Sequence, residues 1–457
     1  MSDQSNDAAV LEESEAQKSS LRDAFTSKTS FIIACVGSAI GVGNIWLFPY
    51  RLTEFGGAAF LIPFFLFVVL LGFSGVIGEM AFGRMAQAGP VGAFGYAFKL
   101  RFGQAKEKLG RALGAIPTIS ILALAIGYSV VVGWILKYLF ASVTGEVLAG
   151  NPGDQFAAIA GNFGSLPWHF LALALTFIVM AFGVSKGIER INKLMMPLFF
   201  ALFVILLVRV ALLPNAFEGY KYLLIPEWSA LADPRTWIYA LGQAFFSLSL
   251  AGSGTIVYGS YLKRNVDVVH SAATVAFFDI VSALLAALVI VPAVFSFGVD
   301  LSAGPALIFM TLPTVFAEMP AGQIFAVLFF LAVVCAALTS LVNLFESPIE
   351  ALENRFKISR VSASCIIALV AAGVGIFIES ADAIGMWMDV VSIFLIPLGA
   401  LMAAVIFFWV CPKGTARIQA QLGRAKKIGP WFEPVTKYVF VVITALVYCL
   451  GIFLGGI

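Results

Sequence analysis

The stretch from Gly37 to Tyr50 reads GSAIGVGNIWLFPY and carries three glycines, an asparagine and a proline within a run of apolar residues. Inside a lipid bilayer, backbone polar groups must be satisfied by the protein, so a helix unwinds there only where it is shielded or lines a polar cavity. The stretch therefore predicts a broken membrane-spanning helix with a binding site at the break.

The bulk composition places this stretch in a membrane protein. Apolar residues make up 61% of the chain, charged residues make up 12%, and the mean hydropathy is +0.98. These values lie outside the range of soluble domains, and an apolar run of about 20 residues is long enough to span a bilayer. We expect an all-α membrane protein with eleven spans, near residues 29–53, 58–82, 113–142, 168–184, 192–213, 236–260, 271–298, 322–349, 361–379, 388–411 and 432–456.

The basic residues indicate which side of the membrane each loop faces. With the N-terminus inside, 23 of the 28 Lys and Arg residues fall in inner loops, where basic residues near helix ends are retained. We therefore expect a multi-pass protein of the cell membrane, such as the bacterial inner membrane, with a cytoplasmic N-terminus and an extracytoplasmic C-terminus. Residues 1–28 lack a hydrophobic region and are expected to form a cytoplasmic tail. The net charge of +2 gives no sign of nucleic-acid binding.

Residues typical of catalysis are scarce. The five cysteines lie in or beside apolar segments without a CxxC pair, so they predict neither a disulfide framework nor a metal site. The two histidines, His169 and His270, lie near predicted helix ends, and no Ser/His/Asp set or HExxH pattern is present. The protein is not expected to be an enzyme.

A second interruption lies in the sixth predicted span, GQAFFSLSLAGSGTIVYGSY from Gly242 to Tyr261. Its Gly-Ser-Gly triplet would support a continuous helix poorly. The alternative is close helix packing through small residues, which the spacing of Gly37 and Gly41 also fits. Breaks in the first and sixth spans occupy matching positions of two five-helix halves, a pattern typical of inverted-repeat transporters.

Several motifs in order resemble the neurotransmitter:sodium symporter family, which includes the bacterial leucine transporter. They are SAIGVGNIW with FPY, FGGAAF, GQAFFSLSL, ALTSL and VSIFLIPLGAL, and the resemblance runs from about residue 22 to residue 409. It implies two inverted five-helix repeats and sodium-driven uptake by alternating access, with the oligomeric state, monomer or homodimer, left open. The implied organisation is a tail at 1–28, repeats at 29–213 and 236–411, an extracellular connection at 214–235, a cytoplasmic loop at 412–431 and an added helix at 432–457.

The resemblance implies two sodium sites built from oxygen ligands, which suit a hard cation beside unwound backbone. The first would use the carbonyl of Ala39 and the side chains of Asn44, Ser247 and Asp279. The second would use carbonyls of Gly37, Ile40 and Ala336 with the hydroxyls of Thr339 and Ser340. Taken without the resemblance, the two hydroxyls of the second site would simply bond back to the preceding helical turn.

Asp279 stands within an apolar run, where a carboxylate is costly unless it is paired. The leucine transporter has an asparagine at this position and a glutamate one turn later, where this chain has Ala283. We infer that Asp279 supplies the negative charge and makes transport independent of chloride. The alternative is a structural carboxylate satisfied by neighbouring helices.

Position 41 indicates the head group of the substrate. Amine transporters of the family carry an aspartate there, whereas Gly41 leaves room for a substrate carboxylate, with backbone amides and the Tyr128 hydroxyl as donors. Gly252 replaces a phenylalanine of the leucine transporter, which predicts a larger pocket and a neutral hydrophobic or aromatic amino acid. The predicted substrate-binding residues are Ser38, Ala39, Val42, Gly43, Leu124, Tyr128, Phe246, Ser247, Ser249, Gly252, Ser340 and Leu344.

The gates depart from the family pattern on the outer side. Leu47 stands where the leucine transporter has its gate arginine, and Arg51 follows one turn later, where it would reach Asp389 or act as an ordinary interfacial arginine. On the inner side, the residues that match the gate are Arg22, Phe25, Ser260, Tyr261 and Glu346. Glu79 is expected to bond the unwound backbones of both broken helices.

Three other functions remain open at this stage. A channel also contains broken helices but passes current without saturable coupled flux. A sodium-dependent amino-acid-sensing receptor would bind the amino acid without accumulating it. A proton-coupled amino-acid carrier of the same fold would work without sodium.

Overall fold

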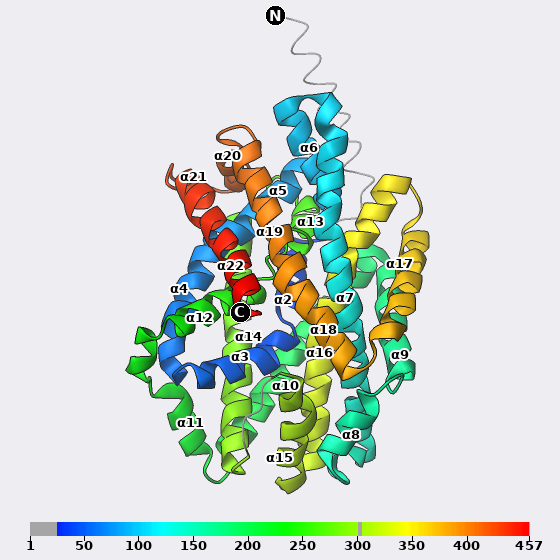
Figure 1. The fold of residues 1–457 in the computed structure, drawn as a ribbon, viewed down its shortest axis with the longest axis vertical. Helices are drawn as coiled ribbons and strands as arrows, with labels where there is room; N and C mark the ends of the chain where they lie inside the picture. The colour runs from blue at the N-terminus through cyan, green and yellow to red at the C-terminus, as the bar shows by residue number, and fades with distance from the viewer. Residues whose placement is uncertain (1–24, 300–303, 457) are drawn as a thin grey trace, which may run out of the picture.

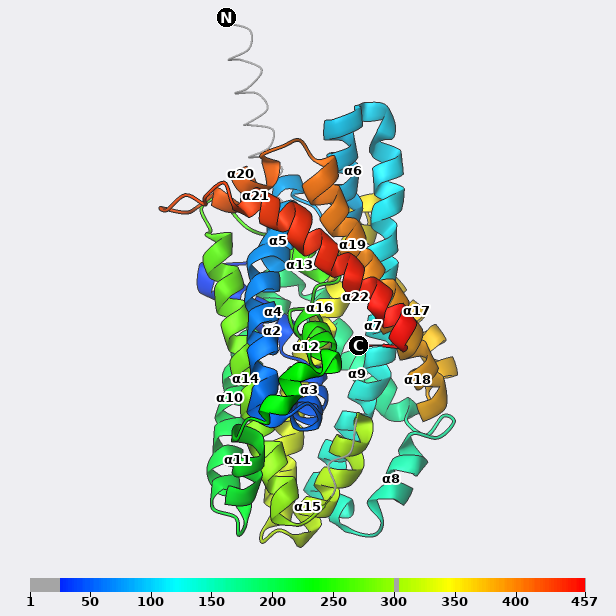
Figure 2. The same ribbon diagram turned by 60° about the vertical axis from the view of Figure 1, so that its left-hand side comes forward.

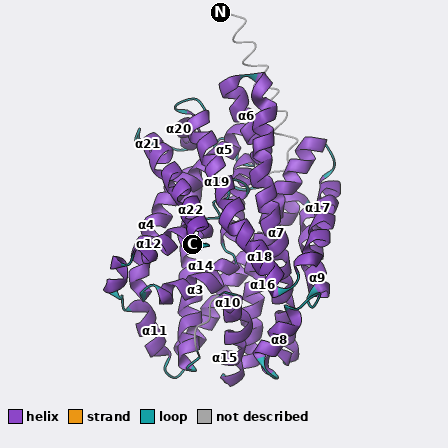
Figure 3. Ribbon diagram, in the orientation of Figure 1, coloured by secondary structure: helices purple, strands orange, loops and turns teal. Residues whose placement is uncertain are grey.

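A computed structural model describes residues 25–299 and 304–456, and Figure 1 shows them as a bundle of helices elongated along one axis. Figure 3 shows helices and loops and no strand in this described part of the chain. Up to residue 224 the helices are α2 (Lys28–Ala39), α3 (Val42–Glu54), α4 (Leu61–Leu71), α5 (Ile77–Ala86), α6 (Pro90–Phe102), α7 (Glu107–Thr144), α8 (Pro152–Ile159), α9 (Leu166–Ala181), α10 (Glu189–Ala211) and α11 (Ala216–Leu224). The later helices are α12 (Pro234–Ser247), α13 (Gly254–Ser260), α14 (Val268–Ser296), α15 (Leu312–Glu318), α16 (Gly322–Phe356), α17 (Arg360–Gly375), α18 (Ala381–Asp389), α19 (Ile396–Val405), α20 (Thr415–Gln421), α21 (Phe432–Pro434) and α22 (Val441–Leu454).

Eight continuous helical stretches in the described chain are long and apolar enough to cross a membrane. Several of them join two labelled helices through a π-helical turn, as Gly72–Val76 joins α4 to α5. A ninth span is the pair α2 and α3, which is bent by 54° at its break. Of the two remaining predicted spans, one is α9, which has only 16 residues, and the other is divided into α12 and α13. The count of eleven spans therefore remains a prediction.

Both predicted helix breaks are present. α2 ends when the amide of Ile40 donates to the carbonyl of Val36, and the next residue, Gly41, is extended at φ −131°. α12 ends at Ser247, and the chain passes through left-handed conformations at Ser249 (φ +54°) and Gly252 before α13 begins. The glycines and serines that weaken the helices in the sequence thus coincide with the unwound segments.

The first broken helix, formed by α2 and α3, packs against long continuous helices. α14 contacts both α2 and α3, while α16 contacts α2, α3 and α7. Figure 1 shows α6 and α20 at one end of the bundle, the α6 end, and α8, α11 and α15 at the other, the α11 end. In Figure 2, α22 crosses the outside of the bundle diagonally from α20 toward the middle. The breaks therefore lie between the two ends, away from both surfaces.

Candidate substrate and sodium site

A cavity of about 200 Å³ lies at the two breaks. Ten of the twelve predicted substrate-binding residues line it: Ser38, Ala39, Val42, Gly43, Leu124, Tyr128, Phe246, Ser249, Ser340 and Leu344. Its wall continues onto α19 and α22 through Ile396, Pro397 and Val447. Residues from both halves of the chain are thus brought to one chamber, and most of its lining is apolar.

One end of the cavity is polar and centres on Gly41. The amide of Val42 donates to the hydroxyl oxygen of Tyr128 at 3.2 Å. A Cβ added to Gly41 would lie 3.5 Å from Ser340 Oγ and 3.6 Å from Tyr128 Oη, so the glycine leaves a gap between two hydroxyls. The gap has hydrogen-bond donors around it and room for a small anionic group.

A buried carboxylate lies beside this end of the cavity. Asp279, on α14, accepts hydrogen bonds from Asn44 Nδ2 at 2.8 Å and from Ser247 Oγ at 2.5 Å. Asn44 Nδ2 also donates to Ser282 Oγ at 3.0 Å. Asp279 is fully buried, and Asn44 and Ser247 are each 2% exposed. The three side chains predicted for the first sodium site therefore meet, although Ser247 faces Asp279 rather than the cavity.

Two of the five predicted ligands of the second site, Gly37 and Thr339, lie close together where α2 meets α16, whereas Ser340 lines the central cavity. The Cβ of Thr339 lies 3.3 Å from the position of a Cβ added to Gly37, so the two helices pack closely. Thr339 Oγ1 donates to the carbonyls of Cys335 at 2.8 Å and Ala336 at 3.1 Å. This back-bonding accounts for the hydroxyl hydrogen but leaves the lone pairs of the oxygen available to a cation.

The prediction that Gly252 enlarges the pocket does not match the geometry. Gly252 has φ +66° and does not line the cavity, because the unwound segment turns it toward α19. A Cβ added there would lie 2.2 Å from the carbonyl oxygen of Gly399. Its amide donates to Glu79 Oε1 at 2.9 Å, so Glu79 holds the unwound segment after α12, as expected for one of the two broken helices.

The proposed outer pair of Arg51 and Asp389 is not formed. Arg51 is 8% exposed, its guanidinium lies 5.2 Å from the ring centre of Tyr239, and Nη1 donates to the carbonyl of Tyr239 at 3.4 Å. Asp389 is exposed to solvent. The arginine is thus not a partner of Asp389 in this conformation, because its guanidinium lies against Tyr239.

On the α6 end, the predicted gate residues form a closed cluster. Tyr261 Oη donates to Glu346 Oε1 at 2.5 Å, and the ring of Phe25 packs 6.2 Å from that of Tyr261. Ser260 Oγ donates to the carbonyl of Val257 at 2.6 Å. Arg22 lies outside the described residues. The cluster therefore links the segment before α2, the residue after α13 and α16.

Two residues of these clusters were missed in the sequence. Arg360 bonds Glu346 through Nη1 at 3.1 Å and Nη2 at 2.5 Å, and its side chain is 14% exposed. In the sequence, Arg360 looks like an ordinary basic residue at the start of a span, although the carboxylate of Glu346 requires a partner.

Asn343 lines the cavity, and its Oδ1 atom is buried without a hydrogen-bond partner. An asparagine within the apolar α16 was the available signal.

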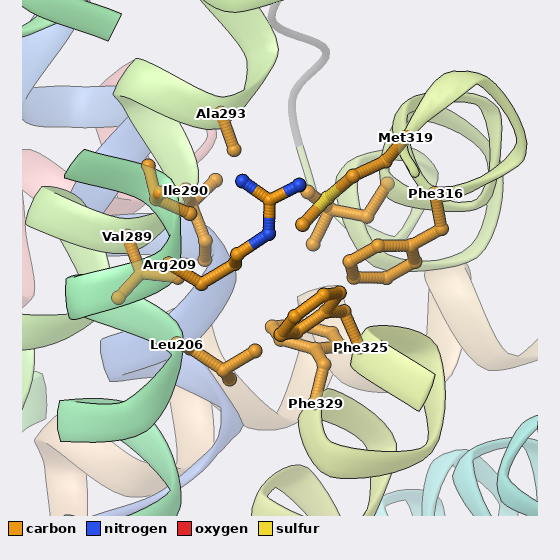
Figure 4. A pocket seen from close by; sticks show the side chains of 11 residues that line it. Leu206, Arg209, Val289, Ile290, Ala293, Phe316, Met319, Phe325 and Phe329 are labelled. Carbon is orange, nitrogen blue, oxygen red and sulfur yellow. The ribbon is translucent and has the colours of Figure 1, made fainter. Parts of the chain in front are cut away.

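A smaller cavity of about 10 Å³ lies between α10, α14, α15 and α16. Figure 4 shows the Arg209 guanidinium entering it among apolar side chains, and its distance from the ring centre of Phe325 is 5.3 Å. A space of this size holds about one water molecule. It is therefore a packing gap, and the cavity at the helix breaks remains the candidate site.

Comparisons with known proteins identify relatives that resemble this chain in sequence and fold. A model of the sodium:neurotransmitter symporter family matches residues 22–158 and 155–455. YhdH, an uncharacterized sodium-dependent transporter of Bacillus subtilis, is 40% identical over 327 residues, covering 70% of each chain. An uncharacterized sodium-dependent transporter of Haemophilus influenzae is 32% identical over 349 residues, covering 74% of this chain and 76% of that protein.

Among solved structures, the crystal structure of MhsT in complex with L-phenylalanine resembles this fold with a TM-score of 0.81. It is 32% identical and covers 95% of this chain and 100% of the MhsT chain. Because the family model spans nearly the whole sequence and a solved relative shares the fold, the chain belongs to the sodium:neurotransmitter symporter family.

Proposed function

We propose that the protein is a sodium-coupled symporter that imports a neutral amino acid with a hydrophobic or aromatic side chain, by alternating access and without chloride. The observation that carries this proposal is the gap at Gly41, bordered by the hydroxyls of Tyr128 and Ser340. An α-carboxylate fits there, because hydroxyl and amide donors stabilise an anion while a first sodium ion balances its charge.

The first sodium ion would bind the carbonyl of Ala39, the side chains of Asn44 and Ser247, and the carboxylate of Asp279. Asp279 supports this assignment because it is fully buried and its nearest partners are neutral donors. A buried carboxylate without a cationic partner is costly, and a sodium ion beside it removes that cost. Since Asp279 provides the negative charge, an added chloride ion is not needed. A second ion would bind between α2 and α16.

The side chain of the substrate would occupy the apolar part of the cavity. A volume of about 200 Å³ and a wall that extends to α19 and α22 suit a bulky neutral side chain. Apolar pockets discriminate by about 1–3 kcal/mol for one methylene group, so we expect a preference among neutral amino acids rather than strict selection. The similarity to a relative solved with L-phenylalanine supports an aromatic substrate.

Alternating access assigns the two ends of the bundle to two sides of the membrane. The positive-inside rule places the α6 end and the N-terminus in the cytoplasm and the C-terminus outside, in a bacterial inner membrane. The cluster of Phe25, Tyr261, Glu346 and Arg360 would then be the cytoplasmic gate, closed in this conformation. Import would require this cluster to separate once the outer side has closed.

The test is counterflow of labelled neutral amino acids into liposomes that contain the purified protein. We expect uptake of phenylalanine or a similar amino acid that requires sodium and is unchanged when gluconate replaces chloride. Uptake driven by a pH gradient in sodium-free buffer would instead identify a proton-coupled carrier. Sodium-dependent binding without accumulation would identify a sensor, and a requirement for chloride would reject the role of Asp279.

A further inference from the structure

Asn192 is a fully buried polar side chain on α10 that the proposed function does not use. Its Nδ2 donates to the carbonyl of Ile188 at 2.8 Å, whereas its Oδ1 has no hydrogen-bond partner. Buried side-chain oxygens nearly always have a partner, so an isolated one calls for an explanation. The side chain does not line the central cavity, which excludes a direct contact with the substrate there.

The unpaired oxygen points at the junction of three helices. A Cβ added to Gly37 on α2 would lie 1.9 Å from Asn192 Oδ1 and 3.3 Å from the Cβ of Thr339 on α16. Only a glycine at position 37 allows α10 to approach this closely. The bond from Nδ2 to Ile188 determines the orientation of the amide, so that the oxygen and not the nitrogen faces α2 and α16.

The polar groups at this junction are all hydrogen-bond acceptors and would all be satisfied by a cation. The amide of Gly41 donates to Asn44 Oδ1 and the amide of Asn44 donates to the carbonyl of Gly41, so the carbonyls of Gly37 and Ile40 lack their usual helical partners. The Thr339 hydroxyl directs its hydrogen to Cys335. Asn192 Oδ1 adds another acceptor on the α10 side of Gly37. A cluster of oxygen acceptors with no donor among them attracts a hard cation, since oxygen atoms are the ligands such ions prefer.

We propose that Asn192 belongs to the second sodium site and presents its Oδ1 atom to the ion. This inference rests on the proposed function, because it takes the second ion to bind between α2 and α16. It adds α10 as a third helix at the ion. α10 follows the π-helical turn Val184–Ile188, so an ion held by Asn192 fixes the first turn of α10 against the broken helix.

A mechanical consequence follows for ion release. The start of α10 is also joined to the segment before α2, because the amide of Thr26 donates to Glu189 Oε2 at 2.8 Å. Departure of the ion would remove one of these two links between α10 and the first broken helix. Sodium release and movement of the α6 end would therefore be coupled through α10.

The test is a sodium titration of thermal stability in purified protein without substrate, supported by binding of radioactive sodium. Asn192→Ala should raise the half-saturating sodium concentration by about 10-fold, the scale of losses when a group supporting a metal site is removed. Asn192→Asp, which keeps the oxygen and adds negative charge, should bind sodium more tightly than Asn192→Ala. Thr176→Ala, which removes a buried hydroxyl on α9 bonded to Ala172, is the control and should leave the titration unchanged.

Thr339→Ala distinguishes an error about the second sodium site from an error about the role of Asn192. If Thr339→Ala weakens sodium binding while Asn192→Ala does not, the second site stands and the role of Asn192 is wrong. If neither variant changes the titration, the second site itself is wrong. Should Asn192→Ala fail to fold, Asn192→Ser and Asn192→Asp answer the same question, and equal sodium affinity in both and in the unmodified protein overturns the inference.

Discussion

Gly252 and Gly254 stand two residues apart in the second break, yet their surroundings differ completely. Gly252 has φ +66° and faces the Gly399 carbonyl, whereas a Cβ on Gly254 would meet no atom within 4 Å. Left-handed backbone and a clash with another backbone atom both oppose a side chain at Gly252. The glycine is needed for packing against α19, and we expect its replacement to change stability rather than substrate selection.

We predict that Gly252→Ala lowers the free energy of unfolding by about 1–3 kcal/mol. Gly254→Ala, at the start of α13, should change it by less than about 1 kcal/mol. Thermal unfolding of both variants in detergent measures the difference. Equal melting temperatures for the two variants would show that Gly252 does not face the Gly399 carbonyl in the folded protein.

Asp279 allows a second prediction at this scale. In Asp279→Asn, the donors Asn44 Nδ2 and Ser247 Oγ lose their charged acceptor, and the proposed first sodium ion would lose a negative ligand. We expect sodium affinity to fall at least about tenfold, or about 1.4 kcal/mol, and uptake to become stimulated by chloride. Uptake in liposomes with chloride or gluconate measures this. Asp382→Asn on the exposed start of α18 is the control, and an effect of the same size there would contradict the assignment.

At the scale of elements, the end of α16 is joined to α17 by Glu346 and Arg360. The carboxylate is almost fully buried, and both of its oxygens accept from the guanidinium while one also accepts from Tyr261. Removing one partner of a buried ion pair leaves an uncompensated charge at a cost of about 3–5 kcal/mol. In a carrier with two conformations, loss of Arg360 therefore destabilises the conformation in which Glu346 and Arg360 are paired.

We therefore predict that Arg360→Gln opens the α6 end more often. The reporter is Cys35, which is buried on α2, in a protein whose other four cysteines are serine. Its rate of labelling by a small maleimide should rise several-fold relative to the parent. Arg355→Gln, whose guanidinium lies 5.8 Å from the ring centre of Phe356, should leave the rate unchanged, and a rise in both variants would indicate a general loosening of the structure.

Another buried link joins α7, α9 and the residues after α17. His169 Nδ1 lies 2.7 Å from Glu379 Oε1, and His169 Nε2 lies 2.9 Å from Ser129 Oγ. We predict that Glu379→Gln lowers the free energy of unfolding by about 1–3 kcal/mol, because it leaves buried groups poorly paired. A double-mutant cycle with His169→Gln should give a coupling of about 0.5–3 kcal/mol.

The exposed pair Lys221 and Glu218 provides the matched control for that cycle. Exposed ion pairs contribute about 0–1 kcal/mol, so a cycle on this pair should give little coupling. If the cycle on His169 and Glu379 gives an equally small coupling, the buried pair adds no stability of its own.

At the scale of the whole molecule, sodium and substrate should stabilise the fold together. The first ion and the substrate carboxylate would share one site, so each raises the affinity for the other. A ligand at 100 times its dissociation constant adds about 2.7 kcal/mol to the stability of the folded state. We predict that phenylalanine raises the melting temperature in sodium buffer and has little effect in potassium buffer. An equal rise in potassium would argue against coupling.

Much of the fold could be read from the chain because membrane helices obey local rules. An apolar run of about 20 residues has few alternatives in a bilayer, and the glycines and serines at 37–44 and 249–254 weaken a helix wherever they occur. The positions of both breaks and ten cavity-lining residues were predicted on this basis and from the family motifs. The division of the sixth span into α12 and α13 has the same local origin.

Only the tertiary structure decided which way side chains turn after an unwound segment and which partners they meet. Gly252 faces α19 because the backbone reverses there, Arg51 lies under Tyr239 rather than beside Asp389, and Asn192 meets Gly37 across 155 positions of sequence. The physical reason is that helix breaking depends on a few consecutive residues. Contacts between helices depend instead on the packing of the whole bundle, which no local pattern encodes.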